Sequence, residues 1–425
     1  MAIPEDLLHF IWKLRLFQTD QLLTVEGKQI TVLNVGEHNR NAGPDFLFSK
    51  IRIGEVEWVG SVEIHVKSSD WLLHQHQDNA HYHNVILHVV WEHNQDIFYT
   101  DGSCIPTLRL ADYVPQRLLW RYQNLMKNAT WIPCENQVQD LDSFKTESWL
   151  DRMTIERMEE KSKVILDLLD QSNGDWEKTF FIWLFRSFGF KVNAEAFQEL
   201  GARLPLLLLK KYRKDTLKLE AIIFGQAGFL NRTFEDAYPL QLQKEYVYLQ
   251  KIYLLEDISL PLKFLRMRPY NFPTIRLAQL TSLMQEGVHL EQILNLQHPR
   301  DFRLMLDQIQ VAHYWHTHFN FEKQTSSPHT CQLSKRSQDG LIINVVVLFT
   351  FAYGLYFKQE ARKEKAIKWL EDLPGEKNSI TQKFENIGIR TVHAAHSQAL
   401  LHIKSRYCDR KQCLSCGIGV ELLKR

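Results

Sequence analysis

The sequence is poor in cysteine, with six in 425 residues. Disulfide frameworks are typical of short, cysteine-dense secreted chains, so this number excludes that class and favours a reducing environment. The N-terminus also lacks a secretory signal pattern, because Glu5 and Asp6 stand where such a signal is basic and no small-residue cleavage site follows. We therefore expect a cytoplasmic protein.

Long hydrophobic runs and an excess of charge are absent as well. The apolar run 345–357 is shorter than the roughly 20 residues of a membrane span, so it predicts a buried helix and no membrane partner. Lys and Arg number 51 against 50 Asp and Glu, so any surface for nucleic acid must be local. Phosphate-loop, dinucleotide, nucleophile-elbow and kinase motifs are missing, which excludes those enzyme classes.

Two kinds of hydrophobic pattern divide the chain. A helix predicted from Pro4 to Phe17 precedes several β-like runs, of which 84–93 is the most apolar. Helical spacing dominates beyond about residue 116, at 146–170, 176–188, 193–211, 215–230, 239–254, 274–285, 300–311, 341–358, 361–371 and 393–406. We predict an α+β protein with a small N-terminal α/β domain containing a mixed sheet (1–115), a helical region (116–400) and a Cys-rich tail (401–425).

The stretch from Asn41 to Lys67 has the pattern best suited to catalysis. Asp45 precedes one β-like run, and Gly54-Glu55 predicts a hairpin turn into the next. In that second run, the two-residue period of a strand places Glu63, His65 and Lys67 on one face. Two carboxylates hold Mg²⁺ or Mn²⁺, and a neighbouring cation can orient the attacking water. This stretch therefore predicts a divalent-metal phosphodiesterase site; polar strand faces without a function would give the same pattern.

The same residues resemble the PD-(D/E)xK, or restriction-endonuclease-like, nuclease superfamily. Pro44-Asp45 is similar to the first half of its motif and Glu63-Ile64-His65 to the second half, with His65 where Lys is expected. The resemblance implies that Asp45 and Glu63 bind the metal and that His65 or Lys67 takes the role of the Lys. An inactive nuclease-like domain is the other outcome that this replacement allows.

Histidines give an alternative local interpretation. Seven lie between positions 65 and 93, and His74-x-His76 or His81-x-His83 would converge in an extended segment. Neutral imidazoles with a carboxylate suit Zn²⁺ or Mn²⁺. His88 stands in an apolar run, which is more typical of a core histidine than of a ligand.

The C-terminal tail contains Cys408, Cys413 and Cys416. This Cys-x4-Cys-x2-Cys spacing begins a plant-type iron–sulfur pattern and also suits zinc, so we expect a 4Fe–4S cluster or Zn²⁺. The tail has no fourth ligand of its own. The candidates are Cys331, Cys134, Cys104, His402 and His396.

Cations and aromatics cluster at 265–276. Arg266, Arg268 and Arg276 flank a loop that opens a predicted helix at Thr274, where a helix N-terminus and Arg side chains suit a phosphate. DNA or RNA is therefore an expected partner for these residues. A loop fixed by Arg–carboxylate pairs is the structural alternative.

Several segments together resemble a family of bacterial proteins catalogued as a domain of unknown function, over nearly the whole chain: GPDF, VEIHVKSSDW, EAIIFGQAGFL, RPYNFPTIRLAQL, SQAL and YCDRKQCLSCGIG. That resemblance implies no activity. The leading hypothesis from the residues is a metal-dependent nuclease or nuclease-like nucleic-acid-binding protein. The alternative is a non-catalytic interaction or scaffold protein with a structural metal site and an unknown protein partner.

Overall fold

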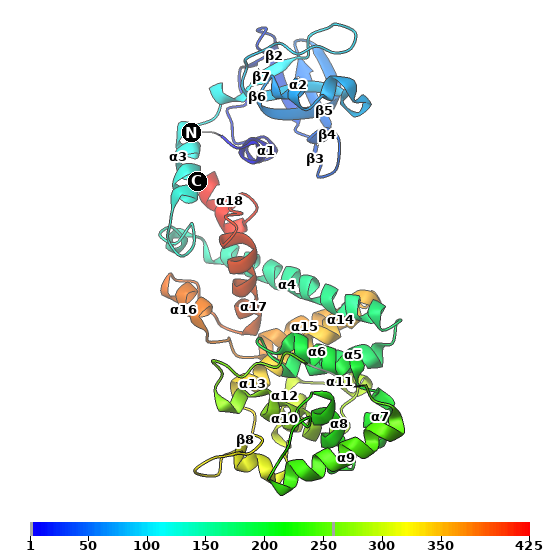
Figure 1. The fold of residues 1–425 in the computed structure, drawn as a ribbon. Coiled ribbons are helices and arrows are strands. Elements are labelled where there is room, and N and C mark those ends of the chain that lie inside the picture. Colours follow the sequence, from blue (N-terminus) through cyan, green and yellow to red (C-terminus); the bar gives the residue numbers. More distant parts are fainter. Residues whose placement is uncertain (1–2, 257–259) are drawn as a thin grey trace. The chain divides into compact units, whose positions relative to one another are not determined.

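The structure is a computed structural model that describes residues 3–256 and 260–425 (Figure 1). The fold is α+β, with a mixed sheet in the N-terminal part followed by a mostly helical region, as the sequence predicts. The chain forms two compact units. The first contains the residues up to Trp149 together with 386–389 and 403–425, and the second contains 150–385 and 390–402.

In the described residues, seven strands form one mixed sheet in the first unit. They are β1 (Leu22–Leu23), β2 (Gln29–Asn34), β3 (Glu37–His38), β4 (Phe46–Ile53), β5 (Val56–Lys67), β6 (Val85–Glu92) and β7 (Thr107–Arg109). The order is β1-β2-β4-β5-β6-β7, and β3 pairs with the start of β4. Pairing is antiparallel from β1 to β5 and parallel from β5 to β7.

The β4–β5 hairpin and the β5–β6 crossover place the polar residues of the first unit. Gly54 turns the chain between β4 and β5 with φ +60, a backbone conformation that favours glycine. Because β5 and β6 are parallel, residues 68–84 must return the chain across the sheet. This crossover contains α2 (Asp70–Leu73) and two short 3₁₀ turns, η1 (His76–Asp78) and η2 (Ala80–Tyr82).

Helix α1 (Glu5–Lys13) contacts β5. Its apolar positions recur every three or four residues, so one face is buried: Leu7, Leu8, Phe10, Ile11 and Trp12. Pro4 precedes the helix with an extended backbone, which fixes where it begins. The helix predicted from Pro4 to Phe17 is therefore confirmed, although it ends four residues earlier.

The helices of the second unit match the predicted segments closely, except that those at Leu290–Asn295, Lys335–Leu341 and Ser379–Asn386 were not predicted. They are the greater part of α4 (Ser143–Gln171), α5 (Trp176–Phe188), α6 (Ala194–Arg203), α7 (Leu206–Lys211), α8 (Thr216–Gln226), α9 (Ala237–Tyr253), α10 (Pro273–Gln285), α11 (Leu290–Asn295), α12 (Pro299–Asp307), α13 (Lys335–Leu341), α14 (Leu348–Tyr356), α15 (Glu360–Asp372), α16 (Ser379–Asn386) and α17 (Ala394–His402). The segment predicted at 193–211 is divided into α6 and α7, because Pro205 cannot continue a helix.

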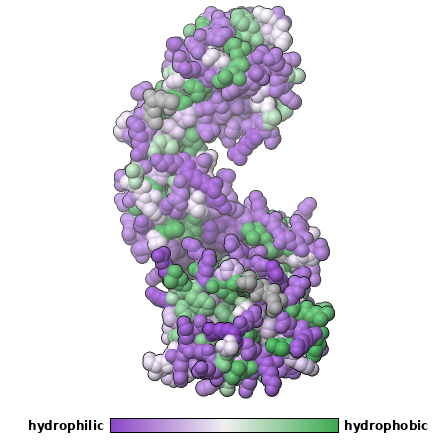
Figure 2. Space-filling view, viewed as in Figure 1, coloured by the Kyte–Doolittle hydropathy of each residue, from purple (hydrophilic) through white to green (hydrophobic). Residues whose placement is uncertain are grey.

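The most apolar helical segment lies in the core of the second unit. Lys335–Tyr356 is long and apolar enough to cross a membrane by length and composition, and 67% of its most apolar window is buried within the protein. Val345, Val346 and Phe349 are fully buried in a core that α5, α8 and α10 share. On the face shown in Figure 2 the surface is largely hydrophilic, with hydrophobic areas such as that over α7, where Leu207 is exposed.

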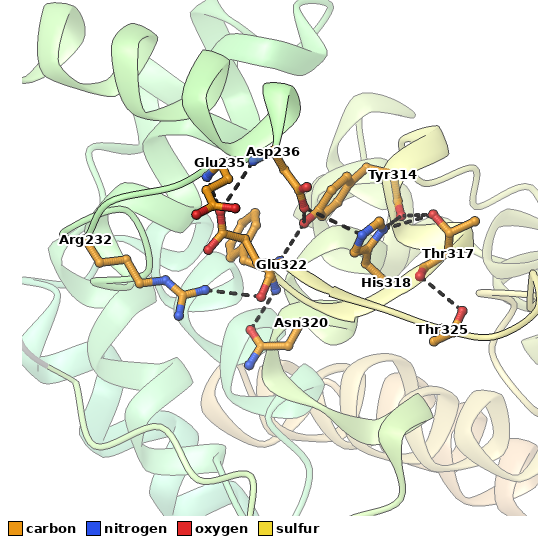
Figure 3. Close-up of polar contacts among 10 residues, drawn as sticks. Arg232, Glu235, Asp236, Tyr314, Thr317, His318, Asn320, Glu322 and Thr325 are labelled. Atoms are coloured by element: carbon orange, nitrogen blue, oxygen red, sulfur yellow. Dashed lines mark hydrogen bonds and ion pairs between the residues drawn. The ribbon is translucent and has the colours of Figure 1, made fainter.

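A polar network holds the short β8–β9 hairpin (His318–Asn320 and Lys323–Gln324) of the second unit (Figure 3). The Tyr314 hydroxyl donates to Asp236 at 2.8 Å and accepts from the Glu322 amide at 2.8 Å. The Tyr314 ring also stacks on His318 at 3.9 Å, and Trp315 beside it is fully buried. These aromatics and histidines pack and bond with one another, which is a structural role.

Residues 403–425 belong to the first unit, whereas the sequence analysis divides the chain at 115 and 400. The described tail continues from the π-helical turn Ile403–Cys408 to α18 (Gly417–Lys424), which contacts α3 (Gln116–Lys127). Glu421 accepts a hydrogen bond from Lys145 at 2.6 Å. The tail thus packs on the segment that follows the sheet.

Candidate active site

Asp45 and Glu63 lie together where β4 begins beside β5. The Ile64 amide donates to Asp45 Oδ2 at 2.9 Å, and the Asp45 amide donates to Glu63 Oε2 at 3.1 Å. Each carboxylate therefore bonds the backbone of the other residue's segment. The antiparallel pairing of Phe46 with Val62 fixes this register.

Three imidazoles converge beside Glu63. The ligand nitrogens of His65, His74 and His76 all lie within 4.8 Å of one another. Glu63 Oε1 lies 3.4 Å from His65 Nε2 and 3.2 Å from His76 Nε2. Among the described residues, His76 Nε2 has no hydrogen-bond partner despite this closeness. Nitrogen and oxygen atoms that face one another in this way suit a bound cation such as Mn²⁺ or Zn²⁺.

The crossover from β5 to β6 positions two of these imidazoles. His74 ends α2 and His76 begins η1, while Gln75 between them has a left-handed backbone with φ 59. The His74 and His76 rings lie 5.0 and 5.2 Å from the His65 ring. His74 is exposed and the other two are buried, so the group opens to solvent on the His74 side.

His88 supports the group from the neighbouring strand β6, where it pairs with Glu63 in the parallel register. Its Nε2 lies 2.9 Å from His65 Nδ1. If His65 Nδ1–H donates this bond, His65 Nε2 keeps its lone pair on the side of Glu63 and His74, which is the tautomer a metal ligand needs. The sequence suggested a core histidine, and His88 is indeed fully buried.

Burial shifts the pKa values of His65, His88 and Glu63. Burial and the neighbouring imidazoles lower the pKa of His65 to about 2, and burial lowers the pKa of His88 to about 3. Both rings are therefore neutral at pH 7 and able to ligate. Burial, followed by the Asp45 charge, raises the pKa of Glu63 well above its ordinary value. The ionised form of Glu63, buried beside Asp45 and neutral imidazoles, therefore has too little positive charge around it to be stabilised. A bound cation would supply that charge.

Helix α1 adds two groups, His9 and Glu5, that the sequence pattern did not indicate. His9 Nε2 lies 3.2 Å from Asp45 Oδ2. Burial lowers the pKa of His9, but Asp45, Glu5 and Asp6 outweigh it, so that the net pKa is raised. Burial also raises the pKa of Glu5, helped by Asp45. The signal in the sequence was a polar residue, His9, among the buried apolar positions of an amphipathic helix.

Lys67 does not join this group. Its side chain is exposed, and its amide donates to Asp70 Oδ2 at 2.8 Å, a bond that holds the start of α2. His81 and His83 are exposed, while His93 bonds Asp96 at 3.0 Å. Of the two His-x-His pairs, the crossover thus brings only the first to Glu63.

A cavity of about 700 Å³ adjoins the imidazole group. His76, Trp71 and Tyr82 line it on the side of the group, and Trp58 and Phe98, both half exposed, line it elsewhere. His76 stacks on Tyr82 with ring centroids 3.8 Å apart. Aromatic faces beside a polar group are able to stack with planar ligands, nucleobases among them.

The arginines predicted to contact nucleic acid divide into two kinds. Arg266 and Arg268 are exposed. Arg276 is 5% exposed, bonds Asn271 at 2.6 Å and lies over the Phe190 ring at 4.3 Å. Its position in the first turn of α10 faces the core, and burial lowers its pKa to about 10. As it lies, the Arg276 side chain is not placed to contact a polynucleotide.

The three tail cysteines lie in the first unit, with Cys413 and Cys416 buried and Cys408 half-buried. All six cysteines of the chain are free thiols. Cys134, from the loop between α3 and α4, is also buried in the first unit, and burial raises its pKa to about 12.

The chain matches no curated protein and no solved structure. Residues 5–379 match the family model described as Protein of unknown function (DUF2851). The match covers the sheet, the imidazole group and nearly all of the helical unit. The chain therefore belongs to this family of proteins of unknown function.

Proposed function

We propose that the protein is a metal-dependent nuclease that hydrolyses phosphodiester bonds of DNA or RNA, with its metal at Glu63 and the adjoining imidazoles. The observation that carries the proposal is the position of Glu63 Oε1, 3.2 to 3.4 Å from two imidazole nitrogens and beside Asp45. With the two-residue strands β1 and β3 left out, the order α1, β2, β4, β5, α2, β6 supports it, because restriction-endonuclease-like cores have the order helix–strand–strand–strand–helix–strand.

The donor set selects among the ions expected from the sequence. Mg²⁺ prefers oxygen ligands only, whereas imidazole nitrogens with a carboxylate suit Mn²⁺ or Zn²⁺. We therefore propose Mn²⁺ rather than Mg²⁺ at Glu63, His65, His74 and His76, with Zn²⁺ as the competing ion. When bound, such an ion polarises a phosphate and lowers the pKa of a water molecule.

The residues of the chain divide the remaining tasks. His65 is neutral and buried, so it cannot supply the positive charge of the Lys that it replaces. His9 lies beside Asp45 and has a raised pKa, so we assign that charge to His9 instead of Lys67. His74 is the exposed member of the imidazole group, so it lies where a substrate from solution would meet the metal. Arg266 and Arg268 stay our candidate contacts for the polynucleotide backbone.

Cleavage of single- and double-stranded DNA and RNA with added Mn²⁺, Mg²⁺ or Zn²⁺ tests the proposal. Glu63→Gln should lower the rate by more than about 100-fold, beyond the effect of losing a supporting residue. Glu57→Gln is a matched control, because Glu57 is an exposed residue of the same strand that pairs with Lys50 at 2.8 Å. Equal cleavage by the Glu63→Gln variant and the wild type would refute the assignment.

A second candidate, a non-catalytic scaffold with a structural ion, has one observation in its favour. Glu63 and His65 are 5% and 1% exposed, so both groups are buried away from a substrate in solution. In that case the wild type binds about one Mn²⁺ ion per chain at this site, and Glu63→Gln loses it, yet no substrate is cleaved with any ion. Measuring metal content alongside cleavage separates the two functions.

A further inference from the structure

The loop that contains Cys134 and the tail that contains Cys408, Cys413 and Cys416 pack against each other in the first unit, where Lys404 of the tail lies over the Trp131 ring of the loop. Burial raises the pKa of Cys134 to about 12, helped by the neighbouring Cys416 and Cys413, and burial together with Cys416, Cys134 and Cys413 raises the pKa of Cys408. Cys134, Cys413 and Cys416 are 7 to 8% exposed. No pair of them forms a disulfide. The loop after α3 therefore supplies a fourth thiol to the three of the tail.

Specific contacts hold the tail against this loop. Lys411 Nζ donates to the Met126 carbonyl at 2.7 Å, and Lys404 Nζ lies 5.3 Å from the Trp131 ring. At the other end of the tail, Lys145 Nζ donates to Glu421 at 2.6 Å. Contacts on both sides of the Cys-x4-Cys-x2-Cys segment thus hold the tail against the part of the chain that contains Cys134.

Glycines allow the close approach of the segment to its surroundings. A Cβ on Gly419 would lie 2.2 Å from the Cys413 carbonyl, and one on Gly417 would lie 2.6 Å from the Trp149 ring. Cys416 is the residue before α18, and the amides of Ile418 and Gly419 donate to its sulfur. Burial raises the pKa of the Cys416 thiol, and these amide donors at the helix N-terminus offset part of that rise.

The other candidates for the fourth ligand lie elsewhere. The Cys331 thiol donates to the Trp315 carbonyl at 3.0 Å in the core of the second unit. Cys104 adjoins β7 and donates to the Ile105 carbonyl at 3.8 Å. His402 lies 3.2 Å from Glu156 in the second unit. Cys134 alone among the described cysteines outside the tail shares the surroundings of Cys408, Cys413 and Cys416.

We propose that Cys134, Cys408, Cys413 and Cys416 together bind one thiolate-liganded metal centre, either an iron–sulfur cluster or a single zinc ion. Four cysteines are the ligand set of both. The inference goes beyond the proposed nuclease function and does not depend on it, since it involves neither Glu63 nor the imidazole group. Such a centre would join the tail to the loop after α3 and so stabilise the first unit.

The test is the metal content of the full-length chain purified without oxygen. Iron, zinc and acid-labile sulfide are measured per chain for the wild type, Cys134→Ser and Cys416→Ser, with Cys331→Ser and Cys104→Ser as controls. We expect the wild type and both controls to hold the centre, and the Cys134→Ser and Cys416→Ser variants to lose it to the same extent. Iron with sulfide and visible absorption identifies a cluster, and zinc without either identifies a zinc site.

Two results would overturn the proposal. One is wild-type protein with no more tail-bound iron or zinc than the Cys416→Ser variant. The other is a Cys134→Ser variant that retains the full content. Alkylation of the native wild-type protein is a second test that does not depend on whether a variant folds. The four thiols should resist the reagent until a chelator removes the metal. Thiols that react equally before and after chelation would contradict the assignment.

Discussion

At the scale of single residues, Glu63 determines how the metal-free protein responds to alkali. Burial and Asp45 raise the pKa of Glu63 above the ordinary 4.5. The free energy that this shift contributes to folding is therefore fully present below pH 4.5, and it is lost as the pH rises towards the raised pKa. The Glu63→Gln variant lacks this loss. In chelator, we predict that the wild type loses up to about 1 kcal/mol per pH unit above pH 7 relative to Glu63→Gln.

Denaturant unfolding of both proteins at pH 6, 7, 8 and 9 measures this difference. The lowered pKa values of His65 and His88 have the opposite effect on stability. Their contribution to the free energy of unfolding is fully present above pH 6.5 and is lost as the pH falls. Both proteins contain these histidines, so subtraction removes them. Parallel pH profiles for the two proteins would show that Glu63 is not buried as described.

His88 supports a second prediction at this scale. Its bond to His65 Nδ1 fixes the tautomer and orientation of the ligand, and outer-shell partners of this kind alter metal affinity by about 10- to 100-fold. His88→Phe keeps an aromatic ring in the buried position but removes the bond. We expect Mn²⁺ affinity, measured by calorimetry, to fall within that range while the exposed control His83→Gln is unchanged. An unchanged affinity in His88→Phe would mean that His65 is not a ligand.

At the scale of elements, the pairing of β5 with β6 positions Glu63, His65 and His88 together. A Cβ on Gly60 would lie 2.5 Å from Ile86 Cγ2 and 2.6 Å from the Asn84 carbonyl. Gly60→Ala should therefore push β5 from β6 and cost about 1–3 kcal/mol of unfolding free energy. Val59→Ala is the control, since Val59 is 64% exposed on the same strand and should cost under about 0.5 kcal/mol. Equal stability of the two variants would contradict the described packing.

The sequence predicts these elements better than it predicts their contacts. Helical periodicity and the Gly54 turn are local, so α1, β4, β5 and most later helices follow from the pattern of residues. The meeting of Asp45 with Glu63 was foreseen from a hairpin. That His9 reaches Asp45, or that His76 rather than His81 reaches Glu63, depends on how α1 and the crossover pack on the sheet. The burial of Arg276 likewise comes from tertiary packing. The polar sequence of the preceding loop does not indicate it.

At the scale of the whole molecule, two compact units should respond differently to metal removal. Both metal sites proposed here lie in the first unit, and a bound ion at about 100 times its Kd adds about 2.7 kcal/mol to the stability of the folded state. A strong chelator should therefore lower the unfolding temperature of the first unit only. Hydrogen exchange read unit by unit measures this. Equal loss of protection in both units would contradict it.

The central claim is that Glu63 and the imidazoles of His65, His74 and His76 hold one divalent ion. Anomalous X-ray scattering from crystals grown with Mn²⁺ tests it most directly. The account predicts one strong peak about 2.1–2.3 Å from a Glu63 oxygen and from nitrogens of these histidines. The absence of a manganese peak beside Glu63 in protein saturated with Mn²⁺ would contradict it, whereas iron or zinc at the four cysteines would give a separate peak distinguished by its absorption edge.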